Sequence, residues 1–286
     1  MDRLPINALL FIDGGDPREA QKAKELLGYI DGQTTNPTLI SKNPQVQERL
    51  TRGERLTKKE ALNFYKKIVT EIAKITDGPI SIEVYADKNT TSKEMLEQAE
   101  KLVVWTKNTY IKFPTNKEGL QAAQVACQKF SINMTLCFSQ EQAAAVYSAT
   151  KEARYEVFIS PFIGRLDDRG ENGMDLVKNI LDMYQNGDGH VKVLTASVRS
   201  IQHILYAIKL KSPALTIPFK VFQEWATTHF VLPDENFQYK SVSKSIPYQK
   251  LSLDKPWQEY HIRHELTDIG MERFSADWNL MIRDWE

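Results

Sequence analysis

Short apolar segments with strand character alternate along most of the chain with longer segments of helical periodicity. The strand-like segments are Ala8 to Asp13, Gly32 to Asn36, Pro79 to Tyr85, Tyr110 to Pro114, Ser131 to Cys137, Tyr155 to Phe162, His190 to Ala196 and Ala214 to Phe219. The helix-like segments are Pro17 to Leu27, Lys58 to Ile75, Ser92 to Trp105, Lys117 to Phe130, Ser139 to Lys151, Met174 to Tyr184 and Val198 to Leu210. Eight such units predict a parallel α/β fold that closes into a (β/α)8 TIM barrel. A doubly wound sheet usually has fewer strands and a Gly-rich first turn, and no GxGxxG motif follows the first strand.

The length of the chain fits one such barrel. With 286 residues, 42% of them hydrophobic, the chain can build one large core, so we expect a single barrel domain over residues 1–286. Two segments exceed the minimal repeat. Asn43 to Asp77, after the second strand, is expected to hold an additional helix before Lys58 as a helical insertion, and residues 220–286 are expected to form a helical C-terminal extension packed on the barrel.

The C-terminal extension contains a predicted helix at Val221 to Thr228 and an amphipathic tail from Pro256 to Trp285. We expect the tail to cover a barrel mouth or to form a homo-oligomer interface. Its aromatic residues are expected to be packing anchors rather than ligand-stacking groups. They are Trp257, Tyr260, Phe274, Trp278 and Trp285.

The charge and cysteine content indicates which partners to expect. Lys plus Arg and Asp plus Glu number 37 each, so no global basic field attracts nucleic acid or an anionic membrane. No apolar run approaches the roughly 18 residues that a membrane span requires, and no signal peptide is recognisable. Cys127 and Cys137 have neither zinc-site nor disulfide spacing, and no other metal motif is present. We therefore expect a cytosolic protein with reduced thiols that acts on a small molecule.

A lysine occupies an unusual place in the fourth predicted strand. Alternation puts Tyr110, Lys112 and Pro114 on one face and Ile111 and Phe113 on the other, so Lys112 is expected to point into the barrel. An ammonium in apolar surroundings loses hydration, its pKa falls, and the neutral amine can attack a carbonyl to form a Schiff base. A lysine at the edge of the surface or in a buried ion pair is the alternative interpretation.

Polar residues recur near the ends of the other predicted strands. Barrel enzymes place their active sites at the carboxyl ends of the strands, so these residues are candidates for catalysis and binding. They are Asp13, Asn36, Glu83, Asn133, Thr135 and Ser160, followed by Phe162, Arg165, Ser197 and Arg199. Together with Lys112 they place an acid, an amide, an acid, a lysine and a hydroxyl on five consecutive strands, in one expected layer. The two arginines suggest a phosphate site.

Each candidate also has a purely structural alternative. Asp13 could cap the helix near Pro17, although Asp16 is better placed for that role. Asn36 before Pro37 could be an ordinary turn residue, and Glu83 could simply neutralise Lys112.

The remaining alternatives concern the barrel interior and the loop after the sixth strand. Asn133, Thr135 and Ser160 could be satisfied interior polar groups. Arg165 could pair with Asp167 or Asp168 as a brace for its loop.

Several blocks of the sequence, in this order, resemble the transaldolase family of class I aldolase-type (β/α)8 barrels, which also includes the small fructose-6-phosphate aldolases. The resemblance extends from the first strand to about Arg199. The blocks are Phe11 to Asp16, Thr34 to Leu39, Ser81 to Val84, Ile111 to Pro114, Asn133 to Ser139 and Ile159 to Arg165. This resemblance implies a Schiff base on Lys112, an acid/base role for Asp13, and a catalytic water held by Glu83 and Thr135.

The resemblance also implies the substrate-binding roles. Asn36, Asn133 and Ser160, with Phe162, would bind the dihydroxyacetone portion of the sugar, and Arg165, Ser197 and Arg199 would bind its phosphate. No metal or organic cofactor would be needed. The implied activity is transaldolase: a dihydroxyacetone unit moves from fructose 6-phosphate or sedoheptulose 7-phosphate to an aldose phosphate in the pentose phosphate pathway.

Two alternatives remain open. A fructose-6-phosphate aldolase would release free dihydroxyacetone, but the small aldolases have glutamine at the position of Glu83, so the carboxylate here favours transfer. A catalytically silent barrel would bind sugar phosphates, or a protein partner through the Trp-rich tail. Retention of Asp13, Glu83, Lys112 and Thr135 argues against a silent barrel.

Overall fold

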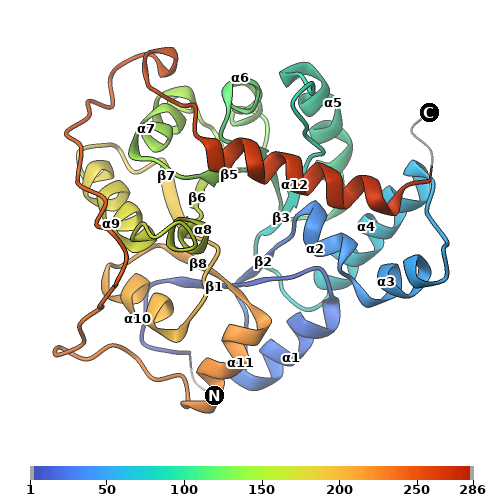
Figure 1. Cartoon of the computed structure of the whole chain (residues 1–286), viewed down its shortest axis with the longest axis horizontal. Coiled ribbons are helices and arrows are strands. Elements are labelled where there is room, and N and C mark those ends of the chain that lie inside the picture. Colours follow the sequence, from blue (N-terminus) through green and yellow to red (C-terminus); the bar gives the residue numbers. More distant parts are fainter. Residues whose placement is uncertain (1–2, 284–286) are drawn as a thin grey trace.

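The structure, a computed structural model, describes residues 3–283. Within these residues, eight parallel strands form a closed barrel in which each strand pairs with the next and β8 returns to β1 (Figure 1). The strands are β1 (Leu9–Asp13), β2 (Gly32–Thr34), β3 (Ile80–Glu83), β4 (Thr109–Pro114), β5 (Ile132–Cys137), β6 (Val157–Pro161), β7 (Val191–Thr195) and β8 (Ala214–Pro218). The predicted (β/α)8 fold class is confirmed.

Within residues 3–283, helices cover the outside of the barrel; seven of them return the chain from one strand to the next, and α11 follows β8. They are α1 (Pro17–Leu27), α4 (Lys58–Ile72), α5 (Ser92–Leu102), α6 (Lys117–Ala126), α7 (Gln140–Ala149), α9 (Gly173–Tyr184), α10 (Ile201–Lys209) and α11 (Phe219–Thr227). Because helices pack on the outer face and side chains fill the interior, both faces of the strands are buried. In β4, Ile111 and Phe113 are fully buried on one face, and Lys112 is only 2% exposed on the other.

Local sequence signals explain where several helices begin. Asp16 caps α1 and Pro17 occupies its first turn, as predicted from the sequence. Thr57 and Thr91 each form a complete capping box, with Glu60 and Glu94 respectively. These caps satisfy backbone N–H groups that would otherwise lack partners at the helix ends.

Short helices near the ends of β2 and β6 depart from the simple repeat. The additional helix expected before Lys58 is present as α3 (Pro44–Thr51), and a second one, α2 (Pro37–Ser41), precedes it. Another short helix, α8 (Ile163–Asp167), follows β6. Helices α2 and α8 were not predicted, because five residues are too few to establish a helical period. The predicted helix Ser92 to Trp105 is in fact α5 followed by a separate 3₁₀ turn, η1 (Val103–Trp105).

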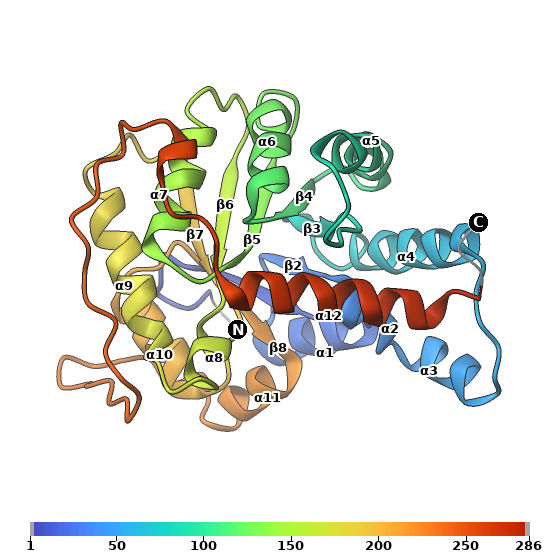
Figure 2. The ribbon, with the colours of Figure 1, turned by 45° about the horizontal axis from the view of Figure 1, so that its top comes forward.

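The C-terminal segment wraps around the barrel and then crosses its mouth. After α11 an irregular stretch runs past α10 and α9 to the short turn η2 (Trp257–Glu259), and α12 (Glu265–Met281) then passes in front of the barrel towards α4 (Figures 1 and 2). The hydroxyl Oγ1 of Thr267 donates to the Leu136 carbonyl of β5 at 2.9 Å. The tail therefore covers the carboxyl ends of the strands of its own chain, while its role in a homo-oligomer stays a prediction.

The helix of this segment, α12, occupies only part of the predicted amphipathic tail, since it starts at Glu265. Four of the tail's five aromatic residues are buried, as expected of packing anchors: Trp257, Tyr260, Phe274 and Trp278. Trp285 lies outside the described residues. Between residues 3 and 283, no helix combines the length and the apolar character that crossing a membrane would need.

A buried tyrosine ties helix α4 to the strands that carry the candidate site. The hydroxyl of Tyr65 accepts a hydrogen bond from the backbone N–H of Glu83 at 3.1 Å and lies 2.6 Å from Oγ1 of Thr35. Thr35 Oγ1 in turn donates to the Ser81 carbonyl at 2.7 Å, so Tyr65 is the donor in its contact with Thr35. The chain of hydrogen bonds fixes the end of β3 against β2 and α4.

Replacement of Tyr65 by phenylalanine is expected to lower the free energy of unfolding by about 1–3 kcal/mol, because the buried N–H of Glu83 would lose its partner. Urea denaturation followed by circular dichroism measures this change. Tyr248→Phe is the matched control, since Tyr248 is 46% exposed, and we expect a change within about 0.5 kcal/mol. Equal stability of Tyr65→Phe and the parent would show that this network does not hold the strands.

Candidate active site

Lys112 points into the barrel and is held by two polar groups. Its ammonium Nζ lies 3.0 Å from Oε2 of Glu83 and donates to the Thr35 carbonyl at 2.9 Å. The strand register explains the first contact, because Glu83 and Lys112 are directly opposed on β3 and β4. The predicted orientation is confirmed. The expected apolar surroundings are wrong, since a carboxylate on the neighbouring strand reaches the ammonium.

The charge of this ammonium acts on two carboxyl groups. Burial raises the pKa of Glu83, and the charge of Lys112 opposes that rise. Asp13, on β1, is half-buried; desolvation raises its pKa, while Lys112, a hydrogen bond from Thr34 and Arg199 lower it. Raised carboxyl pKa values beside an amine are the arrangement that general acid–base chemistry requires.

Hydrogen bonds across the interior connect the neighbouring strands. The Ser160 hydroxyl donates to Oδ1 of Asn133 at 2.7 Å, and Nδ2 of Asn133 donates to the Ser81 hydroxyl at 3.1 Å. Asn133 is paired directly with Lys112 in the register of β4 and β5. The amide therefore lies beside the lysine with both its oxygen and its nitrogen oriented.

Thr135 has a hydroxyl that the protein does not satisfy. It is fully buried, and its Oγ1 has no hydrogen-bond partner among the described residues. Glu83 Oε2 likewise lacks a well-aligned hydrogen bond there, although it forms the ion pair with Lys112. Buried polar atoms usually have partners, so these two oxygens are suited to hold a water molecule or a substrate hydroxyl.

The candidate residues do not all share one register row. Glu83, Lys112 and Asn133 form one row of paired residues. Asp13 is paired with Thr34, in the row two residues before Glu83. Thr135 is paired with Pro114, in the row two residues after Lys112. A closed barrel is staggered, so residues from different rows can reach the same height. The influence of Lys112 on the pKa of Asp13 is consistent with such proximity.

Arg199 and Ser197 meet the start of α8 in close packing. The Gly164 N–H donates to the Ser197 carbonyl at 3.0 Å, and a Cβ at Gly164 would lie 2.3 Å from Nε of Arg199. Only glycine leaves room for that guanidinium. Ser197 itself has a φ of 60°, a conformation that costs a non-glycine residue free energy and is often found at functional sites.

Arg165, on α8, forms no ion pair with any residue between 3 and 283. Asp168 pairs instead with Arg199 at 3.2 Å, and Asp167 with His203 at 3.2 Å, so the interpretation of Arg165 as a loop brace is wrong. Burial lowers the pKa of Arg165, as do the charges of Arg273 and Arg199. A half-buried cation close to other cations favours an anion in the space between them.

Asn36 has a structural role, but as the cap of α2 and not as an ordinary turn residue. Its Oδ1 accepts from the Leu39 N–H at 2.9 Å and caps α2. The amide oxygen therefore stabilises the start of α2.

Several side chains that position the site were not among the residues predicted from the sequence. Thr34 donates to Oδ1 of Asp13 at 2.7 Å and lies 2.5 Å from Oγ1 of Thr216. Ser81 receives the hydrogen bond from Asn133. Strand alternation puts Thr34 on the face of Asn36 and Ser81 on the face of Glu83, so this signal was available, whereas the role of Tyr65 depends on how α4 packs.

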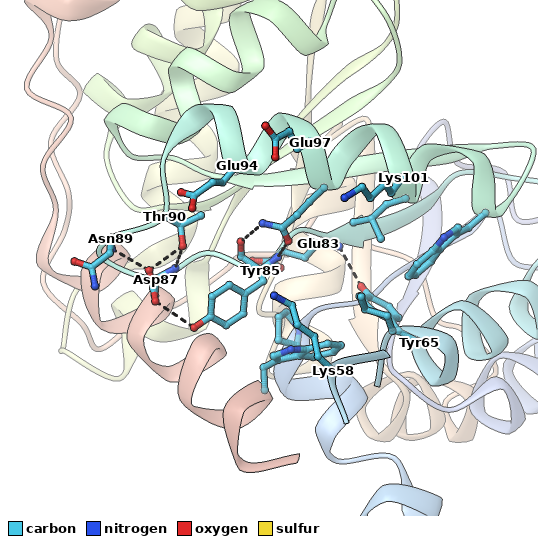
Figure 3. Close-up of a pocket in the computed structure, with 16 residues that line it drawn as sticks. Lys58, Tyr65, Glu83, Tyr85, Asp87, Asn89, Thr90, Glu94, Glu97 and Lys101 are labelled. Carbon is cyan, nitrogen blue, oxygen red and sulfur yellow. Dashed lines mark hydrogen bonds between the residues drawn. The ribbon is translucent and has the colours of Figure 1, made fainter. Parts of the chain in front are cut away.

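A cavity lies beside the site and not at its centre. It has a volume of about 470 Å³ and is bounded by α4, α5, the segment after β3 and Trp278 of α12 (Figure 3). Of the site residues predicted from the sequence, only Glu83 lines it. Several of its polar groups bond to one another: Asp87 accepts from Tyr85 and Thr90, and Gln98 bonds both backbone groups of Tyr85.

Comparison with known proteins gives a consistent result across the chain. Residues 10–284 match the family model described as transaldolase/fructose-6-phosphate aldolase. A probable transaldolase of Anaeromyxobacter sp. (strain Fw109-5) is 34% identical over 271 residues, which cover 94% of this chain and 96% of that protein. Probable transaldolases of Caldicellulosiruptor saccharolyticus and Clostridioides difficile are also 34% identical, over 273 and 269 residues; each alignment covers 94% of this chain, and 96% and 95% of the relatives, respectively.

The raised pKa of Asp13 predicts a stability effect. The ordinary pKa of an aspartate carboxyl is 3.8. Between pH 3.8 and the raised pKa of Asp13, the folded state binds more protons than the unfolded chain. The free energy of unfolding therefore falls as the pH rises through this window. Asp13→Asn removes the desolvated charge. We expect this variant to be more stable than the parent at pH 7, with a gain that shrinks as the pH is lowered towards 3.8.

Urea denaturation at pH 7 and at pH 4 measures the effect. The control is Asp234→Asn, which neutralises an exposed carboxylate and should leave stability nearly unchanged at both pH values. A loss of stability in Asp13→Asn at pH 7 would contradict the prediction.

Proposed function

We propose a function for this chain, which belongs to the transaldolase/fructose-6-phosphate aldolase family. It is a transaldolase that moves a dihydroxyacetone unit from a ketose phosphate to an aldose phosphate. The observation that carries this proposal is the buried amine of Lys112, 3.0 Å from one carboxylate and within the electrostatic influence of a second. The proposed donors are fructose 6-phosphate and sedoheptulose 7-phosphate, as in the pentose phosphate pathway. The cytosolic location stays a prediction from the sequence.

The first step forms a covalent intermediate. Lys112 gives a proton to a neighbouring carboxylate, and its neutral amine attacks C2 of the ketose to form a carbinolamine. Protonation of the C2 hydroxyl and departure of water leave an iminium. Glu83 is suited to hold that water, because its carboxylate lies against the amine and has a raised pKa.

The second step breaks the bond between C3 and C4. Asp13 takes the proton of the C4 hydroxyl, an aldose phosphate leaves, and the electron pair of the bond moves into the iminium to give an enamine on Lys112. An acceptor aldose phosphate then reacts in the reverse direction: the enamine carbon attacks its aldehyde carbon, and Asp13 returns the proton to the new hydroxyl. Water hydrolyses the resulting iminium and releases the new ketose.

The remaining polar groups would bind the substrate without taking part in proton transfer. Asn133 and Ser160, already oriented by their mutual hydrogen bond, would hold the hydroxyls of the three-carbon unit, with Asn36 and Phe162 beside them. Arg165, Ser197 and Arg199 would bind the phosphate. The unpaired state of Arg165 among the described residues supports this role, since an anion would relieve the cost of its burial.

Trapping of the Schiff base tests the proposal directly. Borohydride reduction in the presence of fructose 6-phosphate should leave a three-carbon adduct on Lys112, detectable by mass spectrometry of the peptide that contains it. Lys112→Ala should give no adduct, whereas Lys117→Ala, a change at the nearby lysine of α6, should retain it. An adduct on another lysine, or none with folded parent protein, would contradict the mechanism and would favour a barrel that binds sugar phosphates without reacting.

The same protein distinguishes transfer from simple cleavage. Release of free dihydroxyacetone without an acceptor would favour the fructose-6-phosphate aldolase alternative over transaldolase.

The phosphate site predicts a selective kinetic defect. Arg165→Ala should raise KM for fructose 6-phosphate about 10- to 100-fold, because a charge-assisted hydrogen bond contributes about 1.5–3 kcal/mol. Binding of unphosphorylated fructose should not change. Steady-state kinetics and competition binding measure both values.

Arg154→Ala serves as the matched control, since Arg154 is exposed before β6, at the opposite end of the barrel, and should have parental kinetics. Equal effects of Arg165→Ala on phosphorylated and unphosphorylated sugars would exclude a phosphate-binding role for Arg165.

A further inference from the structure

Helix α12 approaches Arg165 at a glycine. A Cβ at Gly270 would lie 2.8 Å from Nη1 of Arg165, and 2.7 and 3.0 Å from the two terminal methyl groups of Leu136. Glycine is a poor residue for the interior of a helix, so its use at this point calls for a local reason. The missing side chain provides the space in which the guanidinium lies.

The guanidinium of Arg165 also lies over two aromatic rings. Its Cζ is 5.7 Å from the centre of the Phe162 ring and 5.3 Å from the centre of the Phe274 ring. Phe162 comes from the end of β6, whereas Phe274 comes from α12, four residues after Gly270, and therefore on the same face of the helix. Ring faces attract a cation and fix its position without neutralising its charge.

We propose that Gly270 and Phe274 of α12 are positioning residues for Arg165, so that the C-terminal helix takes part in selecting phosphorylated sugars over unphosphorylated ones. The inference rests on the proposed function, because it assigns the phosphate of the sugar to Arg165.

Pre-organisation of Arg165 explains how α12 would favour phosphate binding. Arginine has a long, flexible side chain, and a binding site loses affinity when the ligand must first order such a chain. A carboxylate partner would order Arg165 but would also compete with phosphate. Gly270 and Phe274 order the guanidinium while leaving its charge available, and no described residue forms an ion pair with it.

The charge distribution agrees with this assignment. Arg273, also on α12, and Arg199 each act on Arg165 strongly enough to lower its pKa. Arg273 is itself only weakly paired, at 3.9 Å from Asp277. The helix thus brings positive charge to the same region in which it fixes Arg165.

Two substitutions on α12 test the inference. Gly270→Ala would displace the guanidinium, and Phe274→Leu would remove a ring face while keeping an apolar side chain. We expect Gly270→Ala to weaken the binding of inorganic phosphate about tenfold and to raise KM for fructose 6-phosphate by a similar factor, with kcat within about twofold of the parent. Phe274→Leu should have the same effects at about three- to fivefold. Calorimetric titration with inorganic phosphate and steady-state kinetics measure these changes.

Ala276→Gly is the matched control. It exchanges the same two residue types in the opposite direction, on the exposed side of the same helix, and should bind phosphate as the parent does. Unphosphorylated fructose should bind equally to the parent and to all three variants. A purely structural role of α12 would instead weaken the binding of phosphate and of fructose alike.

The outcomes separate this inference from the proposed function. The inference would be overturned if Gly270→Ala and Phe274→Leu both bound inorganic phosphate with parental affinity. It would also be overturned if Ala276→Gly lost as much phosphate affinity as these two variants, or if the parent did not bind inorganic phosphate. Failure to trap an adduct on Lys112 would overturn the proposed reaction, yet the phosphate measurements need no turnover and would still test the role of α12.

Discussion

A charged lysine inside a closed barrel requires an opposite charge close by, and the ion pair between Lys112 and Glu83 meets this requirement. Taking two charges out of water is costly, and removing one partner of such a pair typically destabilises a protein by about 3–5 kcal/mol. Much of the surrounding structure serves to hold the pair. The parallel register places the two residues opposite each other on β3 and β4. The hydroxyl of Tyr65, on α4, bonds the backbone N–H of Glu83 and the hydroxyl of Thr35. The backbone carbonyl of Thr35 in turn accepts a hydrogen bond from Lys112. The same pair places a nucleophile beside a group that can accept its proton.

Helix α12 and the segments after β6 and β7 meet at the mouth of the barrel. Each of the two arginines near the mouth lies against a glycine: Arg199 against Gly164, and Arg165 against Gly270. Glycine at these points lets a guanidinium approach the backbone closely. The chain thereby builds a positively charged region whose geometry depends on segments separated by about a hundred residues in the sequence.

The sequence predicted the fold well because the barrel depends on local and periodic signals. Each of the eight strands lies within or close to its predicted segment, and Asp16 caps α1 as expected. The errors occur where such signals are weak. Helices α2 and α8 are too short to have a period, and the helix predicted from Ser92 to Trp105 ends at Leu102, before the separate turn η1.

The sequence by itself determined the fold class, the inward orientation of Lys112 and the set of polar residues at the strand ends. These features depend on the alternation of residues along a strand and on the order of strands and helices, which local sequence patterns specify. The tertiary structure decided which of these groups touch. For Lys112 it selected the buried ion pair with Glu83 over apolar surroundings, two interpretations that the sequence had left open. It alone showed that Arg165 has no ion-pair partner among the described residues and that α12 reaches Arg165 with Gly270 and Phe274. The physical reason is that strand register, barrel stagger and the path of a C-terminal helix follow from packing over the whole chain, and no local pattern encodes them.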